Sequence, residues 1–211
     1  MKNRNYQDCL LDPTQVAIVI IDHQPQMYFG IEGASRTTIV NNVVALAKTA
    51  QTFGVPCILT TVEANAFSGL LISKEQGVFP QTIPIDRTSI NAWEDENLKK
   101  AVQGTGKHQI LLAGLWTEAC VTFPALSMKA DGYKVYVVAD ACGGASKTAH
   151  HMALQRMIQA DVIPVTWEQV LLEFQRDWNN KDTYNAVMSI VKEHGGAYGL
   201  GVEYAETMVQ Q

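Results

Sequence analysis

Residues 111–126, LLAGLWTEACVTFPAL, decide the fold that this sequence predicts. The run LLAGLW is continuously apolar, as in a strand that is buried on both faces of a parallel sheet. Thr117 then supplies a hydroxyl where a helix needs its N-cap, and Glu118 places a carboxylate in the first turn of that helix. Cys120 follows at the mouth of the helix, where free backbone N–H groups and the helix dipole would stabilise a thiolate. The alternative interpretation makes Cys120 a small buried hydrophobic residue.

Outward from this stretch, strand-like and helix-like segments alternate along the chain. Such alternation within one domain indicates a parallel sheet that is covered by helices on both faces. The sequence therefore predicts a three-layer α/β/α fold with one doubly wound, mostly parallel sheet over residues 10–180. We expect residues 181–211 to form a C-terminal helix and tail that serve in oligomerisation, because apolar extensions need a surface to cover. The strand-like segments are residues 16–21, 55–62, 111–116, 133–139 and 161–165. Within residues 82–91, two apolar residues alternate around Pro84 and are followed by Arg87.

The composition excludes several classes of partner. The net charge is -5 and no run of Lys or Arg occurs, which argues against nucleic acid. The apolar run VAIVII is too short to cross a membrane, and the first residues, MKNRNYQDCLLDP, lack the apolar segment of a secretory signal. The cysteines Cys9, Cys57, Cys120 and Cys142 show no C-x-x-C spacing, which favours a reducing cytoplasm over disulfides or a zinc site. We expect a cytoplasmic protein that binds neither nucleic acid nor membrane.

Two charged residues follow strand-like segments in the same way as Cys120 does. Asp22 comes directly after VAIVII, and Arg87 comes after the short segment that contains Pro84. Because parallel strands end at one edge of their sheet, the three side chains can meet above the carboxyl edge, where open α/β sheets bind ligands. Taken alone, Asp22 could equally be a turn or capping residue, and Arg87 an exposed loop cation.

At this point the sequence resembles the isochorismatase-like, or cysteine hydrolase, superfamily. That family carries an Asp at the end of its first strand in a D-x-Q setting, here IIDHQ, and a nucleophile motif G-x-x-T-x-x-C-V, here GLWTEACV at 114–121. The runs INAWEDENL, FPALS and RDW are similar to the YcaC-like branch of the family. The resemblance implies a catalytic triad of Asp22, Arg87 and Cys120, with Gln24 as a substrate-binding residue.

The resemblance also implies an oxyanion hole and no metal. One backbone donor maps to the N–H of Trp116, beside a cis peptide between Leu115 and Trp116, and the N–H of Cys120 at the start of the helix is a candidate for the other. Amidase members of the family have Lys where this chain has Arg87, and their metal-binding D-x-H cluster is replaced here by TTVEANAFSG, which has no histidine. We therefore expect neither a metal nor another cofactor.

The chemistry of these residue types agrees with amide hydrolysis. A thiol that attacks an amide needs a base for its proton, and the same group can protonate the leaving amine. Asp22 can do both if burial raises its pKa, while Arg87 supplies a fixed positive charge. The sequence thus predicts a cysteine hydrolase that cleaves a C–N bond of a small molecule through a thioester, in a homo-oligomer of four or more copies. The alternatives are a non-catalytic assembly protein on this fold and a redox-reactive thiol protein.

Overall fold

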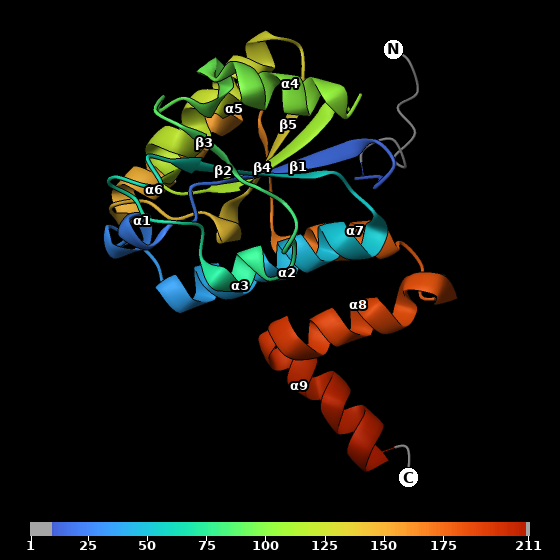
Figure 1. Ribbon diagram of the computed structural model, residues 1–211. Coiled ribbons are helices and arrows are strands. Elements are labelled where there is room, and N and C mark those ends of the chain that lie inside the picture. The colour runs from blue at the N-terminus through green and yellow to red at the C-terminus, as the bar shows by residue number, and fades with distance from the viewer. Residues whose placement is uncertain (1–9, 210–211) are drawn as a thin grey trace.

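One six-stranded sheet organises the chain, and all its strands run parallel (Figure 1). The computed structural model describes residues 10–209. The strands are β1 Val16–Ile21, β2 Cys57–Val62, β3 Ile85–Arg87, β4 Gln109–Gly114, β5 Lys134–Val138 and β6 Ile163–Val165. Their order in space is β3-β2-β1-β4-β5-β6, so the chain winds outward from β1 in one direction and then from β4 in the other. The predicted doubly wound parallel sheet is confirmed.

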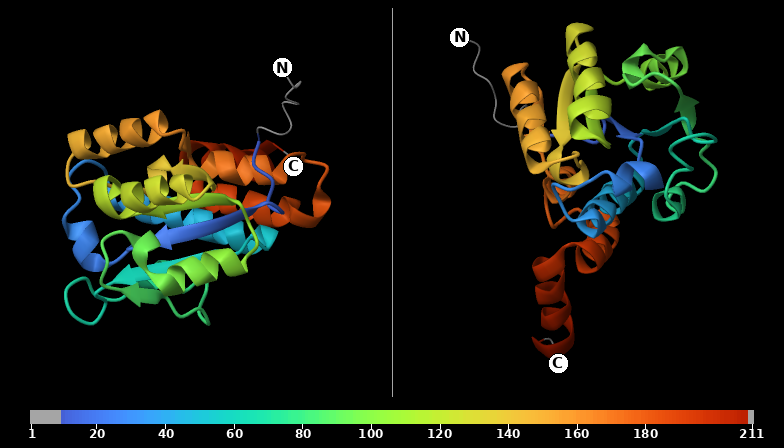
Figure 2. Two further views of the ribbon diagram at one scale, coloured as in Figure 1. Left: turned by 90° about the horizontal axis from the view of Figure 1, so that it is seen from above. Right: turned by 90° about the vertical axis from the view of Figure 1, so that its left-hand side faces the viewer.

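Helices connect the strands and cover both faces of the sheet (Figure 2). The helices are α1 Pro25–Phe29, α2 Arg36–Phe53, α3 Ser73–Gln76, α4 Glu96–Gly104, α5 Thr122–Ala130, α6 Lys147–Gln159, α7 Trp167–Gln175, α8 Lys181–His194 and α9 Gly196–Tyr204. Shorter helical turns are Ala92–Glu94, Thr117–Val121, Ala139–Ala141 and Ala205–Val209. Within residues 10–209, no helix combines the length and the apolar character that a bilayer crossing requires.

The alternation of side chains along β1 builds two cores. Ile18 and Ile20 belong to a core shared with α2, α7 and α8. Ala17, Val19 and Ile21 belong to a second core shared with α4, α5 and α6. Since every residue of β1 is buried, the strand needs an unbroken apolar run.

The two C-terminal helices pack differently: α8 contributes to the core, whereas α9 extends away from it (Figure 2). The predicted domain boundary at residue 180 falls just before α8, yet Val187, Ile190 and Val191 of α8 lie in the main core with α2. Beyond α8, the chain turns at Gly195, and α9 leaves the body (Figure 2).

Candidate active site

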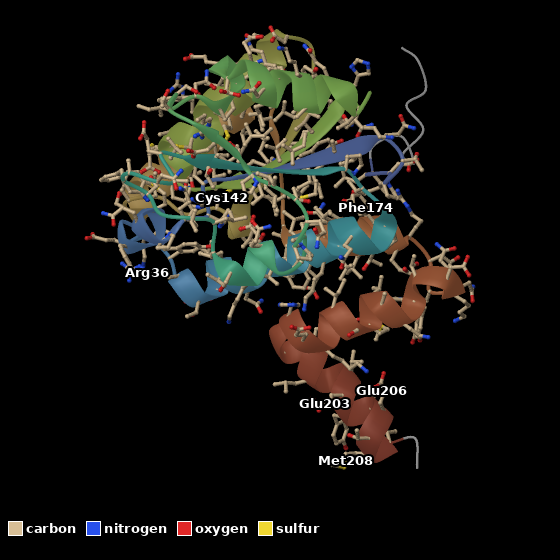
Figure 3. The ribbon with its side chains drawn as sticks, in the orientation of Figure 1. Arg36, Cys142, Phe174, Glu203, Glu206 and Met208 are labelled. Atoms are coloured by element: carbon tan, nitrogen blue, oxygen red, sulfur yellow. The ribbon has the colours of Figure 1, made fainter. Side chains whose placement is uncertain are left out.

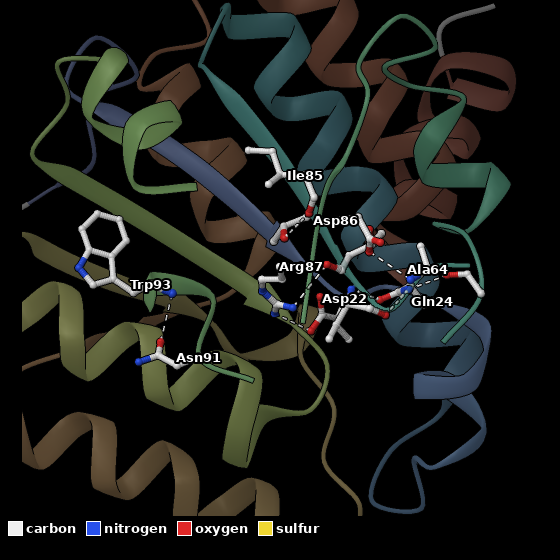
Figure 4. Close-up of polar contacts among 12 residues, drawn as sticks. Asp22, Gln24, Ala64, Ile85, Asp86, Arg87, Asn91 and Trp93 are labelled. Atoms are coloured by element: carbon white, nitrogen blue, oxygen red, sulfur yellow. Dashed lines mark hydrogen bonds and ion pairs between the residues drawn. The ribbon is translucent and has the colours of Figure 1, made fainter. Parts of the chain in front are cut away.

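Three elements bring the predicted site residues together at the carboxyl edge of the sheet. Asp22 follows the last residue of β1, Arg87 is the last residue of β3, and Cys120 lies in the turn that follows β4. Nη2 of Arg87 lies 2.8 Å from Oδ2 of Asp22, and both side chains are buried (Figure 4). The thiol of Cys120 lies beside the same carboxylate.

Asp22 is held in an unusual backbone conformation between two strands. Its φ angle is 57°, in the left-handed region, and its N–H donates to the carbonyl of Thr60 on β2. Burial raises the pKa of the Asp22 carboxyl, and the charge and hydrogen bond of Arg87 oppose that rise. Oδ1 of Asp22 is buried and has no fully formed hydrogen bond among the described residues, so it can take up a proton.

Arg87 is a buried cation and not the exposed loop residue that was the alternative. It is 4% exposed, and its Nη1 donates to the carbonyl of Thr61 at 3.4 Å. The neighbouring Asp86 anchors β3 through its Oδ1, which accepts from the Thr61 hydroxyl at 2.8 Å and from the Ala64 N–H at 3.1 Å. These contacts fix the end of β3 and thereby the position of the guanidinium (Figure 4).

The surroundings of the Cys120 thiol oppose its ionisation. Cys120 is 6% exposed, and burial followed by the negative charge of Asp22 raises the pKa of its thiol to about 12. Arg87 and a hydrogen bond from the Trp116 N–H act in the opposite direction. Burial of the sulfur therefore opposes the stabilisation of the thiolate that the sequence predicts at the mouth of the helix. A base must remove the proton when the sulfur attacks.

The turn that carries Cys120 differs from the predicted helix start. It is a π-helical turn, and its N-cap residue is Trp116 rather than Thr117, with no side-chain cap. The Thr117 hydroxyl instead pairs with Nδ1 of His150 on α6 at 2.8 Å, and the Thr117 carbonyl accepts from the Thr122 hydroxyl at 2.6 Å. The Thr117 N–H donates to the carbonyl of Gly143. The motif threonine thus ties the nucleophile turn to its neighbours.

Trp116 joins the nucleophile turn to α1. The peptide between Leu115 and Trp116 is cis, as expected. The indole Nε1 donates to the carbonyl of Met27 at 2.8 Å, and a Cβ at Gly30 would overlap the indole ring. Gly30 therefore provides the space that the indole occupies.

Gln24 lies beside the site, but its amide is occupied by backbone groups. Its Oε1 accepts from the Val62 N–H at 2.9 Å, and its Nε2 donates to the carbonyls of Val62 at 3.1 Å and Gly69 at 2.5 Å. This geometry favours a structural role for Gln24, which links the end of β1 to β2 and to the loop that follows β2, over the substrate contact expected from the sequence.

The arrangement can perform covalent catalysis with acid–base assistance. It offers a nucleophile, a carboxylate that can accept and return a proton, a fixed cation and a backbone N–H at the sulfur. Among residues 10–209, no group of three or more His, Cys, Asp and Glu side chains is placed to bind a metal ion.

Gly114, the first residue of the nucleophile motif, is predicted to tolerate no side chain. A Cβ there would lie 2.7 Å from both the Cβ and the carbonyl oxygen of Ile21. We expect Gly114→Ala to lower the free energy of unfolding by about 1–3 kcal/mol because of this overlap. Chemical denaturation measures the loss. Gly104→Ala is the matched control, since nothing lies within 4 Å of its Cβ; equal stability of the two variants would contradict the packing argument.

Comparison with known proteins identifies the family of the chain. A family model described as the isochorismatase domain matches residues 16–169. The protein named probable hydrolase YcaC, from Escherichia coli K12, is 40% identical over 171 residues, which are 81% of this chain and 82% of that protein. Isochorismatase domain-containing protein 2A of Mus musculus is 34% identical over 97 residues, which are 46% of this chain and 47% of that protein.

Solved structures of YcaC also resemble the whole fold. YcaC from Pseudomonas aeruginosa is 36% identical with a TM-score of 0.89, and the match covers 94% of this chain and 98% of that one. The E. coli YcaC structure, described as an octameric hydrolase of unknown specificity, is 36% identical with a TM-score of 0.90. The match covers 94% of this chain and 97% of that one. The chain belongs to the isochorismatase family, as a hydrolase similar to YcaC.

Proposed function

We propose that this chain is a cysteine hydrolase that cleaves the C–N bond of a small amide-type molecule through a thioester on Cys120. The observation that carries the proposal is the buried ion pair of Asp22 and Arg87 beside the buried thiol of Cys120. A buried carboxylate whose pKa is raised by burial and that lies beside a thiol is suited to move the proton of that thiol.

In the first half-reaction the sulfur of Cys120 attacks the amide carbon while Asp22 takes the thiol proton. The N–H groups of Trp116 and Cys120 are proposed to stabilise the oxyanion that forms. The C–N bond then breaks, and Asp22 gives its proton to the departing amine. The product of this half-reaction is a thioester and a free amine or ammonia.

In the second half-reaction Asp22 takes a proton from a water molecule, which attacks the thioester carbon. The C–S bond breaks, a carboxylic acid leaves, and the proton returns from Asp22 to the sulfur. Arg87 moves no proton in either half-reaction, because arginine stays charged. Its role is to compensate the negative charge that Asp22 and the sulfur share in a dry site.

A relative's reaction with an electrophile supports a reactive thiol. The solved structure of P. aeruginosa YcaC contains covalent acrylamide. Acrylamide is an electrophile, and thiolates are the strongest nucleophiles among protein side chains. No observation within residues 10–209 favours the redox alternative over hydrolysis: Cys142, the other buried thiol near the turn, accepts a hydrogen bond from the Gly114 N–H.

We also propose that the chain forms a homo-oligomer of at least four copies and acts in the cytoplasm. The octameric state given for E. coli YcaC supports the assembly. The described cysteines Cys57, Cys120 and Cys142 are free thiols, in keeping with a reducing compartment; Cys9 lies outside the described residues.

Ammonia release from a panel of small primary amides tests the proposed reaction. The panel is run on protein treated with EDTA, since the proposed steps need no metal. We expect at least one amide to release ammonia with wild-type protein and none with Cys120→Ser. Release that stops on chelation and returns with added metal would contradict the mechanism, as would equal release by the variant.

A further inference from the structure

The C-terminal residues 196–209 form an arm with an uncovered apolar stripe. Leu200, Tyr204 and Met208 are spaced by four residues, so they line one side of the helical segment. Their exposed fractions are 68%, 61% and 68%. Contiguous apolar surface of this kind on a globular protein marks a contact site. The stripe therefore needs a partner surface.

Contacts with α8 hold the base of the arm and so determine the direction in which the arm extends. Gly199 packs closely against the carbonyl of Val191, where a Cβ would not fit. Further along, Lys192 pairs with Glu206 at 2.9 Å. Figure 3 shows Glu203, Glu206 and Met208 on this arm, away from the body of the protein. The arm is thus presented outward by α8.

A groove on the same side of the sheet has the complementary character. It lies between α2, α3 and the end of α8, and its volume is about 1020 Å³. Apolar side chains line most of it, among them Val40, Val44, Ile72 and Val78. No residue of the arm lines the groove of its own chain. The groove has room for several large side chains and is open in the single chain.

The charges of the groove and the arm are also complementary. Arg36 and Lys74 line the groove, and neither has a carboxylate partner among residues 10–209. Arg36 donates instead to the carbonyls of Tyr28 and Phe29. On the arm, Glu203 has no cationic partner in the described chain. Lys48 and Glu193 also line the groove, but they pair with each other at 2.6 Å, so Arg36 and Lys74 leave the groove with a net positive charge. An arm with an unpaired carboxylate and a groove with unpaired cations favour each other over a second arm or a second groove.

We propose that the arm of one copy docks into the groove between α2 and α3 of a second copy of this chain. The stripe of Leu200, Tyr204 and Met208 fills the apolar floor, and Glu203 faces the cations of the groove. The proposal goes beyond homo-oligomerisation, because it names the two surfaces that meet. A second copy is the favoured occupant because the arm of this chain itself carries the apolar side chains and the carboxylate that would complement the groove.

The test compares the assembly of two variants of the full chain. Leu200→Asp combined with Tyr204→Asp places charges on the stripe at exposed positions, where neither side chain supports the core. We expect light scattering at micromolar concentration to give a mass at most half that of the wild-type assembly, with an unchanged circular dichroism spectrum. Gln103→Asp, an exposed position on α4 at the opposite face of the sheet, should keep the wild-type mass.

Hydrogen exchange then identifies the surface that the arm leaves. In the stripe variant we expect peptides from residues 36–48 and 72–78 to exchange at least about tenfold faster than in wild type, as a released interface does. A stripe variant that keeps the wild-type mass would overturn the proposal. Dissociation with unchanged exchange in both segments would also overturn it, because the arm would then dock on another surface.

Discussion

We expect the replacement of Cys120 with alanine to lower the rate of the proposed amide hydrolysis by at least about 10⁴-fold, equivalent to about 5.5 kcal/mol in the activation barrier. Among the described side chains, the thiol is the only group at the meeting point of β1, β3 and β4 that can form the proposed covalent intermediate. Steady-state kinetics on the amide that wild-type protein turns over measures the loss. Substantial residual turnover would remove Cys120 from the role of nucleophile.

Cys57→Ala is the matched control for that experiment. Cys57 is also a free thiol, but it is the first residue of β2, at the opposite edge of the sheet from the site. We expect its turnover to stay within about threefold of wild type, because it touches none of the three site residues. A similar loss in both variants would show that the effect comes from the fold and not from chemistry.

Replacing Arg87 with methionine has the second largest expected effect. It leaves the buried Asp22 carboxylate without the cation that lies 2.8 Å from it. Removing one partner of a buried ion pair costs about 3–5 kcal/mol of stability. We expect a comparable loss of transition-state stabilisation, at least about 100-fold in rate. Arg87→Lys keeps the charge but loses the planar fork, so it should retain more activity than Arg87→Met.

The pH dependence distinguishes an electrostatic role of Arg87 from a structural one. The positive charge lowers the pKa of both Asp22 and Cys120, so its removal raises both. The base form of Asp22 is present above its pKa and is lost as the pH falls through it. The acid limb of the rate profile should therefore move to higher pH in Arg87→Met, and an unchanged limb would contradict the role. Asp22→Asn combined with Arg87→Met should recover stability without activity, because no uncompensated charge remains.

The sheet could be predicted from the sequence because parallel strands buried on both faces have a simple pattern. The run VAIVII has no polar residue, since every position of β1 faces a core. Strand ends are harder to predict: β4 ends at Gly114 and not at Trp116, because the chain leaves the sheet for the turn that carries Cys120. Hydrophobic periodicity does not indicate the residue at which an apolar run leaves the sheet.

The location of the site could also be predicted, whereas its electrostatics could not. Asp22 and Cys120 follow β1 and β4, and Arg87 is the last residue of β3, so the parallel topology places all three at one edge of the sheet. The raised pKa of the thiol depends on how deeply the sulfur is buried and on its proximity to the carboxylate. Both the burial of the sulfur and its distance from the carboxylate depend on the folded structure, and the helix-dipole argument takes neither into account.

Local motifs do not show which polar partner a side chain takes. Thr117 stands where an N-cap is expected, but its hydroxyl pairs with His150, which lies 33 residues further along the chain. Gln24 stands in a family motif, but its amide binds the backbone of Val62 and Gly69. Long-range hydrogen bonds of this kind cannot be derived from local spacing.

The helix α9 could not be predicted from the sequence pattern for a different reason. Residues 195–201 contain four glycines, which disfavour a helix by about 1 kcal/mol each relative to alanine. Two of these glycines, Gly195 and Gly199, let α9 pass close to the Val191 carbonyl of α8. A helix whose glycines serve close packing lacks the propensity signal on which prediction relies.

Acyl transfer from an activated ester tests the central claim most directly, because it requires no knowledge of the physiological substrate. Wild-type protein is mixed with p-nitrophenyl acetate, quenched in acid within the first turnover, digested and mapped by mass spectrometry. We predict one acetyl group per chain, on Cys120 as a thioester that hydroxylamine removes, and slower acetylation in Asp22→Asn. Acetylation of another residue with Cys120 unmodified, or an equal rate in Asp22→Asn, would contradict an Asp22-assisted thiol nucleophile.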